Sequence, residues 1–138
     1  MDLVTGATGF IGSHLAERLL RTGRRVRVLS RPGSEARLTP PLARGAEIVP
    51  GDLGDAASLA AAVRGVTRLF HCAGHVSDWG EDEAFVAANV RGTEALYAAA
   101  RAAGVARVVH FSSIAVFGTP SPPRFGDDSP VAAKSRDG

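Results

Sequence analysis

Short runs rich in β-branched residues alternate along this chain with longer runs rich in alanine and leucine. Strand-like runs lie at residues 2–7, 24–30, 46–53, 67–74 and 106–113, and helix-like runs at 12–23, 55–65 and from about 82 to 104. Strands that alternate with helices predict an α/β protein whose parallel sheet carries helices on both faces. Right-handed crossovers then give a Rossmann-type, doubly wound arrangement.

Local signals set the expected ends of these elements. Gly23 stands where the first helix needs a C-cap, and Asp55 is placed to be the N-cap of the next long helix. Between them, residues 31–45 contain Pro40 and Pro41, which remove backbone donors. We therefore expect these prolines to interrupt any helix there and to leave a short one at most.

Composition narrows the class of protein. The chain has 138 residues, of which 45% are hydrophobic, so one domain with one core is expected. No apolar run approaches the ~20 residues of a membrane span, and no signal peptide is expected. The single cysteine, Cys72, fits a reducing compartment, so we expect a cytoplasmic protein.

Two further classes of partner are disfavoured by the pattern of charged and metal-ligating residues. The net charge is +2 and no block of like charge occurs, so nucleic acid is not an expected partner. His75 and Asp78 have no further ligands at metal-binding spacing, so no metal site is expected.

The stretch "TGATGFIG" joins the first expected strand to the first expected helix. Gly6 permits a tight turn, Gly9 lets backbone N–H groups approach a diphosphate, and Gly12 lets the helix pack against the strand. The N-terminus of the helix, with its free donors and partial positive charge, then faces the anion. The spacing G-x-x-G-x-x-G differs from the commonest dinucleotide pattern, but the physical requirements are shared.

Several motifs occur together and in a fixed order. They are "TGATGFIG", "GDL" at 51–53, "LFHCAG" at 69–74, "NVRGTEAL" at 89–96 and "FSSIAVFG" at 111–118. This set resembles the extended short-chain dehydrogenase/reductase family of NAD(P)-dependent epimerases, dehydratases and 3β-hydroxysteroid-type dehydrogenases. The resemblance places the cofactor-binding Rossmann domain at residues 1–118.

A set of cofactor-binding residues follows from the glycine turn and from this resemblance. Asp52 corresponds to the family residue that binds the adenine amino group. Asn89 lies mid-helix, where asparagine is a poor helix former and so has a local bonding task. The full expected set is Gly6, Thr8, Gly9, Phe10, Ile11, Gly12, Arg31, Asp52, Leu53, Ala73, Gly74, Asn89 and Ser112.

The end of the second strand bears on the choice between NAD and NADP. Ser30 stands where NAD-dependent relatives often carry an aspartate for the ribose 2′-hydroxyl. Arg31 follows, and its guanidinium can pair bidentately with a 2′-phosphate. We therefore expect NADP in preference to NAD.

The resemblance assigns Ser113 as the catalytic serine that orients the substrate oxygen. Its usual partners, a tyrosine and a lysine in a Tyr-x-x-x-Lys pair, are not found: Tyr97 is followed at that spacing by Arg101, and Lys134 is preceded by Pro130. We expect Tyr97 to be a packing residue of its helix. The Pro/Ser/Gly-rich residues 119–138 are expected to form a loop that leads to a catalytic and substrate-binding part beyond Gly138.

Two functions remain open at this point. The first is hydride transfer to or from a secondary alcohol or ketone, or epimerisation, with a sterol-like molecule or a nucleotide sugar as substrate and a homodimer as the assembly. The second is a non-catalytic module that binds or senses a dinucleotide without the Tyr–Lys pair.

Overall fold

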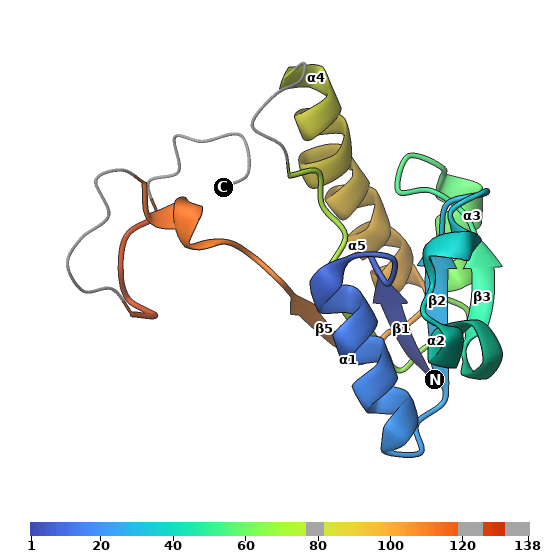
Figure 1. Ribbon diagram of the computed structural model, residues 1–138. Helices are drawn as coiled ribbons and strands as arrows, with labels where there is room; N and C mark the ends of the chain where they lie inside the picture. Colours follow the sequence, from blue (N-terminus) through green and yellow to red (C-terminus); the bar gives the residue numbers. More distant parts are fainter. Residues whose placement is uncertain (77–81, 119–125, 132–138) are drawn as a thin grey trace.

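The computed structural model describes residues 1–76, 82–118 and 126–131. Its sheet has five parallel strands in the order β3-β2-β1-β4-β5. The strands are β1 (Asp2–Thr5), β2 (Val26–Ser30), β3 (Glu47–Pro50), β4 (Arg68–His71) and β5 (Arg107–His110). The chain builds the sheet outward from β1, first through β2 to β3 and then through β4 to β5, as in a doubly wound Rossmann sheet, and this order confirms the predicted fold class. Figure 1 shows β2 and β3 on one side of β1 and β5 on the other.

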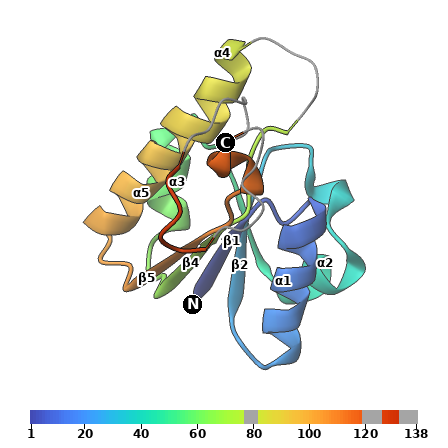
Figure 2. The ribbon, with the colours of Figure 1, turned by 90° about the vertical axis from the view of Figure 1, so that its left-hand side faces the viewer.

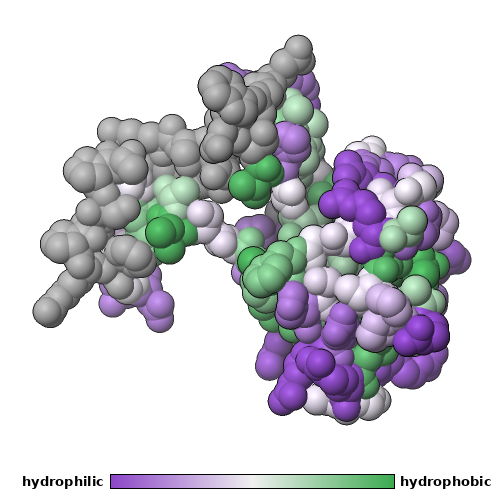
Figure 3. All heavy atoms as spheres, viewed as in Figure 1, coloured by the Kyte–Doolittle hydropathy of each residue, from purple (hydrophilic) through white to green (hydrophobic). Residues whose placement is uncertain are grey.

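Helices cover both faces of the sheet. One face carries α1 (Phe10–Arg21) and α2 (Pro40–Gly45), and the other carries α3 (Ala56–Ala62) and α5 (Gly92–Ala102), as Figure 2 shows edge-on. Adjacent residues of a strand point to opposite faces, so Leu3 packs with α3 and α5 whereas Val4 packs with α1 and α2. Two apolar cores therefore flank the sheet, and hydrophilic residues cover much of the outer surface (Figure 3).

The predicted ends of two helices are confirmed. Gly23 follows α1 with φ of 75°, and its N–H donates to Leu20 O at 2.9 Å. The carboxylate of Asp55 accepts from the backbone N–H groups of Ala57 and Ser58, at 3.0 and 3.3 Å, which caps α3.

Residues 31–45 differ from the expectation. A 3₁₀ turn (η1, Glu35–Arg37) is followed by the six-residue α2, and Pro40 and Pro41 occupy its first turn instead of interrupting it. The first turn of a helix has N–H groups without intrahelical acceptors, so proline costs nothing there and its fixed φ favours the start. The prediction of an interruption was wrong, although the helix is as short as expected.

The long helix expected from residue 82 is present but is not uniform. It consists of α4 (Asp82–Phe85), a π-helical segment, η2 (Val86–Arg91), and α5. A π segment holds more residues per turn than an α-helix and is frequent at functional sites. Asn89 lies within it.

After β5 the chain leaves the sheet and forms a short 3₁₀ turn, η3 (Ile114–Phe117). Of the expected C-terminal loop, only residues 126–131 are described, and there Ser129 N–H donates to Gly126 O at 3.0 Å. The rest of that loop and Lys134 lie outside the described residues. Among the described helices, none is long and apolar enough to cross a membrane.

A buried carboxylate ties the amino ends of the central strands together. Asp2 has a side chain that is 0% exposed and accepts two hydrogen bonds from Arg24 (2.6 and 3.1 Å) and two from Arg68 (2.9 and 2.6 Å). Burial alone would raise the pKa of Asp2, but the hydrogen bonds and charges of Arg68 and Arg24 outweigh it and hold the pKa below its ordinary value.

We expect Asp2→Asn to lower the free energy of unfolding by about 2–4 kcal/mol, because it removes the charge that compensates two arginines at a buried position. Urea unfolding at neutral pH measures this loss. The matched control is Glu47→Gln, which breaks the ion pair of Arg27 with a carboxylate that is 46% exposed and should cost about 1 kcal/mol or less. Equal losses for the two variants would contradict the role given to Asp2.

Candidate dinucleotide site

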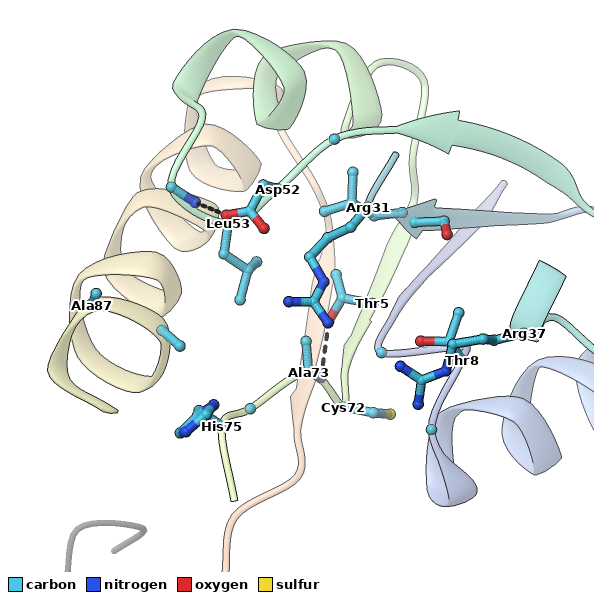
Figure 4. A pocket seen from close by; sticks show the side chains of 18 of the residues that line it. Thr5, Thr8, Arg31, Arg37, Asp52, Leu53, Cys72, Ala73, His75 and Ala87 are labelled. Carbon is cyan, nitrogen blue, oxygen red and sulfur yellow. Dashed lines mark hydrogen bonds between the residues drawn. The ribbon is translucent and has the colours of Figure 1, made fainter. Parts of the chain in front are cut away.

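A cavity of about 480 Å³ lies at the carboxyl ends of the strands, between the turn after β1 and the segment after β4 (Figure 4). In open parallel sheets this crevice is the usual ligand site. The glycine turn after β1, the ends of β2 and β3, the segment after β4 and the helix that begins at α4 all line it. Eight of the expected cofactor residues are among its walls: Gly6, Thr8, Gly9, Arg31, Asp52, Leu53, Ala73 and Gly74.

The glycine turn passes very close to the end of β4. Gly6 has φ of +73°, and a Cβ built on it would lie 2.7 Å from Ala73 N and from Cys72 C. A Cβ on Gly12 would lie 2.3 Å from Gly6 O, so α1 also packs directly on the turn. The turn therefore has the geometry expected from the sequence, with the tight bend at Gly6 and the close helix contact at Gly12.

The first turn of α1 carries donors that the described part of the chain does not use. Its first backbone bond inside the helix is Ser13 N–H to Gly9 O, at 3.0 Å. Within the described residues, the N–H groups of Phe10, Ile11 and Gly12 have no acceptor, and the turn contains no acidic side chain. Such a helix start favours an anion.

Two arginines reach the cavity from the segment that follows β2. The guanidinium of Arg31 extends between Asp52 and Ala73, and that of Arg37, on η1, lies beside Thr8 (Figure 4). In the described part of the chain, no carboxylate forms an ion pair with either. Beside them Ser30 is 3% exposed, and its buried Oγ has no hydrogen-bond partner among the described residues.

Asp52 lines one side of the cavity and fixes the loop after β3 by a hydrogen bond. Its Oδ1 accepts from Gly54 N–H at 2.8 Å, while its side chain faces the cavity. The neighbouring Leu53 packs against α5 so closely that a Cβ on Gly92 would lie 2.8 Å from Leu53 Cβ.

Asn89 performs the local bonding task that its mid-helix position predicted. Its Oδ1 accepts from His75 N–H at 2.7 Å and its Nδ2 donates to His75 O at 2.9 Å. Asn89 itself does not line the cavity. These two bonds fix the segment after β4, and Gly74 and His75 of that segment form one wall of the cavity. The ring of His75 packs edge-on against that of Phe85, with ring centroids 4.5 Å apart.

The remaining expected site residues lie outside the cavity. Phe10 and Ile11 are 81% and 53% exposed at the start of α1. Ser112 and Ser113 follow β5 on the segment that leaves the sheet, and Ser113 Oγ accepts from Ala115 N–H at 3.1 Å as the N-cap of η3. Tyr97 is a packing residue on α5, as predicted, and its ring contacts those of His71 and His110.

Sequence reasoning missed several wall residues. Most of them are next in sequence to an expected residue, and this adjacency was the available signal: Thr5, Gly51, Gly54, Cys72, His75 and Ala88. No expected residue adjoins Leu29, Ala84 or Ala87. Arg37 gave no such signal, because its approach to the cavity depends on the position of η1.

Burial raises the pKa of the Cys72 thiol to about 11, so the thiol remains protonated at neutral pH.

His71, the last residue of β4, is buried directly beneath the cavity wall. Its Nδ1 lies 2.7 Å from Thr5 Oγ1 and its Nε2 lies 2.9 Å from Thr93 Oγ1. Burial, with a smaller contribution from the charge of His110, lowers the pKa of His71 to about 4. The ring is therefore neutral in the folded protein near pH 7.

Comparison with known proteins agrees with this geometry. A sequence model described as the NAD dependent epimerase/dehydratase family matches residues 3–136. The chain belongs to this family. It is thus a member of the extended short-chain dehydrogenase/reductase group that its motifs indicated.

Three similar proteins illustrate the range of the family. Sterol demethylase protein B of Methylococcus capsulatus is 45% identical over 118 residues, which are 84% of this chain and 35% of that protein. A putative dihydroflavonol 4-reductase of Synechocystis is 39% identical over 127 residues, or 91% and 36% of the two chains. The structure of DesIV, a dTDP-glucose 4,6-dehydratase of Streptomyces venezuelae with NAD bound, is 35% identical with a TM-score of 0.86, and the match covers 99% and 46% of the two chains.

The chain thus spans about a third of the length of the curated relatives it matches. The match to solved structures covers the Rossmann sheet and its helices, which are the elements that build the cavity.

Because the folded-state pKa of His71 is below its unfolded value of about 6.5, stability should depend on pH in a defined window. Between about pH 6.5 and pH 4 only the unfolded chain binds a proton at this site, so stability is fully present above 6.5 and falls as the pH is lowered. We expect a loss of about 1–2 kcal/mol between pH 6.5 and pH 5, measured by urea unfolding.

The comparison variant is His71→Gln, in which this site no longer titrates. It should be less stable at pH 7 and should show a flatter dependence on pH over the same window. An unchanged slope would mean that the pH dependence arises elsewhere.

Proposed function

We propose that this chain is the cofactor-binding part of an NADP-dependent oxidoreductase or epimerase of the extended short-chain dehydrogenase type. The observation that carries the choice of NADP is made at the end of β2 and in η1. There Arg31, Arg37 and the buried Ser30 hydroxyl share one cavity with the glycine turn, and none of the three has a carboxylate or hydrogen-bonding partner among the side chains of the described residues. The phosphate on the 2′ position of the adenosine ribose of NADP would accept hydrogen bonds from both guanidinium groups and from the Ser30 hydroxyl. An aspartate in place of Ser30 would repel it.

The residues around the turn fit the diphosphate of such a cofactor. Gly9 leaves the approach open. The N–H groups of Phe10, Ile11 and Gly12, which no described residue accepts, supply hydrogen bonds at the positive end of α1. Asp52 is proposed to accept from the adenine amino group, and Ala73 and Gly74 to provide a wall without side chains that would obstruct the cofactor. Leu53, Thr8 and Ser112 complete the proposed contacts, and Asn89 acts through the backbone of His75.

When bound, the nicotinamide would supply the hydride acceptor or donor for a secondary alcohol or ketone. We propose that Ser113 orients the substrate oxygen by donating its hydroxyl hydrogen, which the bond that Ser113 Oγ accepts from Ala115 N–H does not use. A proton donor is also needed, and Tyr97 cannot provide it because it packs on α5 between two histidines. Since the relatives are about three times longer, we propose that residues outside these 138 carry the tyrosine and lysine.

The substrate is proposed to be a small ketone or alcohol. Relatives named for sterols and for dihydroflavonol favour a polycyclic, sterol-like molecule, whereas the dTDP-glucose dehydratase favours a nucleotide sugar. A homodimer in the cytoplasm is the proposed state of the whole protein.

The test of this function is a fluorescence titration of the chain with NADPH and NADH. We expect NADPH to bind about 10- to 100-fold more tightly, since charge-assisted hydrogen bonds to the 2′-phosphate contribute about 1.5–3 kcal/mol. Arg31→Ala should remove most of this difference, and Ser30→Asp should reverse it by repelling the phosphate and accepting from the ribose hydroxyls.

The matched control is Arg18→Ala, which removes the same charge from the exposed last turn of α1, outside the cavity. It should retain the preference. Equal affinities of the parent chain for the two cofactors would remove the argument from Arg31. If the parent chain bound neither NADPH nor NADH, the proposed function would be wrong.

We expect Gly9→Val to abolish cofactor binding while the chain still folds. A Cβ at this position meets only Gly6 O, at 3.3 Å, so the turn can accommodate it with a small shift, but the branched side chain would stand where the diphosphate must approach. Titration with NADPH, with circular dichroism to confirm the fold, measures the effect. Retained affinity would show that the anion lies elsewhere.

A further inference from the structure

A chain of hydrogen bonds runs beneath the cavity, from α5 through β4 and β1 to the segment after β4. It passes from Thr93 to His71, from His71 to Thr5, and from Thr5 to the backbone N–H of Ala73, with distances of 2.9, 2.7 and 3.3 Å. Thr5 and Ala73 line the cavity, whereas Thr93 does not. The imidazole of His71 is 1% exposed and is the central link.

The directions of these bonds follow from the number of hydrogens available. Thr5 Oγ1 accepts from Ala73 N–H, and the described residues offer its own hydrogen only one acceptor, His71 Nδ1. Nδ1 is then unprotonated, so Nε2 carries the hydrogen of the neutral ring and donates it to Thr93 Oγ1. In this tautomer the one hydrogen without an acceptor among the described residues is that of the Thr93 hydroxyl, which is half-buried and can reach water. In the opposite tautomer it would be the hydrogen of Thr5, which is 1% exposed, so the first tautomer is favoured.

The last link of this hydrogen-bond network, Ala73 N–H, lies where two walls of the cavity meet. Ala73 N is where the extension of β4 meets the glycine turn, since a Cβ on Gly6 would lie 2.7 Å from it. Thr5 immediately precedes Gly6, so one hydroxyl fixes both the start of the turn and the strand end that it crosses. A change of tautomer at His71 would leave the buried Thr5 hydrogen without an acceptor, and the Thr5 hydroxyl could regain one only by turning away from Ala73 N–H.

We propose that His71 is a positioning residue for the cofactor site, and that Thr93 on α5 sets cofactor affinity from outside the cavity by holding His71 as the Nε2-protonated tautomer. This inference rests on the proposed function, because it concerns the affinity of the same cavity. A purely structural histidine would affect the stability of the fold but not the affinity of the folded protein.

The test compares Thr93→Val with Thr93→Ser. Valine has the shape of threonine without the acceptor, so NADPH affinity should fall by about 3- to 10-fold, as for the loss of one hydrogen bond. Serine retains the hydroxyl and should restore affinity to within about twofold of the parent chain. Titrations are made well below the unfolding temperature of each variant.

Tyr97→Phe is the matched control. Tyr97 contacts the same ring, with centroids 5.8 Å apart, but its buried hydroxyl has no partner within the described residues. It should therefore leave NADPH affinity unchanged. If it weakens binding as much as Thr93→Val, or if Thr93→Val binds as the parent does, the inference is wrong.

A second readout is independent of the cofactor. Nitrogen-15 NMR of the parent chain at pH 7 should show His71 unprotonated at Nδ1 and protonated at Nε2, and the Ala73 amide resonance should shift in Thr93→Val but not in Thr93→Ser. The opposite tautomer, or an unmoved Ala73 resonance, would overturn the positioning role. Failure of the parent chain to bind NADPH would instead contradict the proposed function, and the NMR result would still decide the inference.

Discussion

The close approach of two backbones holds this site together. The turn after β1 crosses the end of β4 at a distance that leaves no room for a side chain at Gly6, and α1 rests on the same turn at Gly12. The parallel register of β1 with β4 brings these segments side by side. Once they touch, the start of α1 must face the crevice, and the ends of β2 and β3 form its other walls. The cavity is therefore a direct product of the sheet order and not of any single binding residue.

The arginines at the two ends of the sheet differ in whether a carboxylate pairs with them. At the amino ends, the buried Asp2 compensates two arginines and ties β1, β4 and the start of β2 together. At the carboxyl ends, Arg31 and Arg37 have no carboxylate counterpart in the described part of the chain. A cavity that holds two arginines without an ion-pair partner among the described residues is suited to receive an anion.

The sequence was sufficient to predict the α/β class, the Rossmann order and the roles of Gly6 and Gly12, because each depends on local pattern or on a fixed turn geometry. It failed at Pro40 and Pro41, where the same residue type either begins or breaks a helix depending on the turn before it. It also gave no sign of Arg37, whose reach depends on η1, or of the π segment. The asparagine at position 89 could be singled out by its poor helix propensity, but its partner, the backbone of His75, is set only by tertiary packing.

The burial of the Asp2 carboxylate has a consequence for the response to ionic strength. Dissolved ions screen charges that water reaches, with a Debye length of about 8 Å at physiological salt, and act much less on charges enclosed by protein. The side chain of Asp2 is 0% exposed, whereas Arg31 and Arg37 are open to solvent. Concentrated salt would therefore weaken the attraction of Arg31 and Arg37 for an anion more than it weakens the ion pairs of Asp2, whose arginines are 43% and 28% exposed. If the proposed cofactor binds in this cavity, added salt would release it from the chain before the chain unfolds.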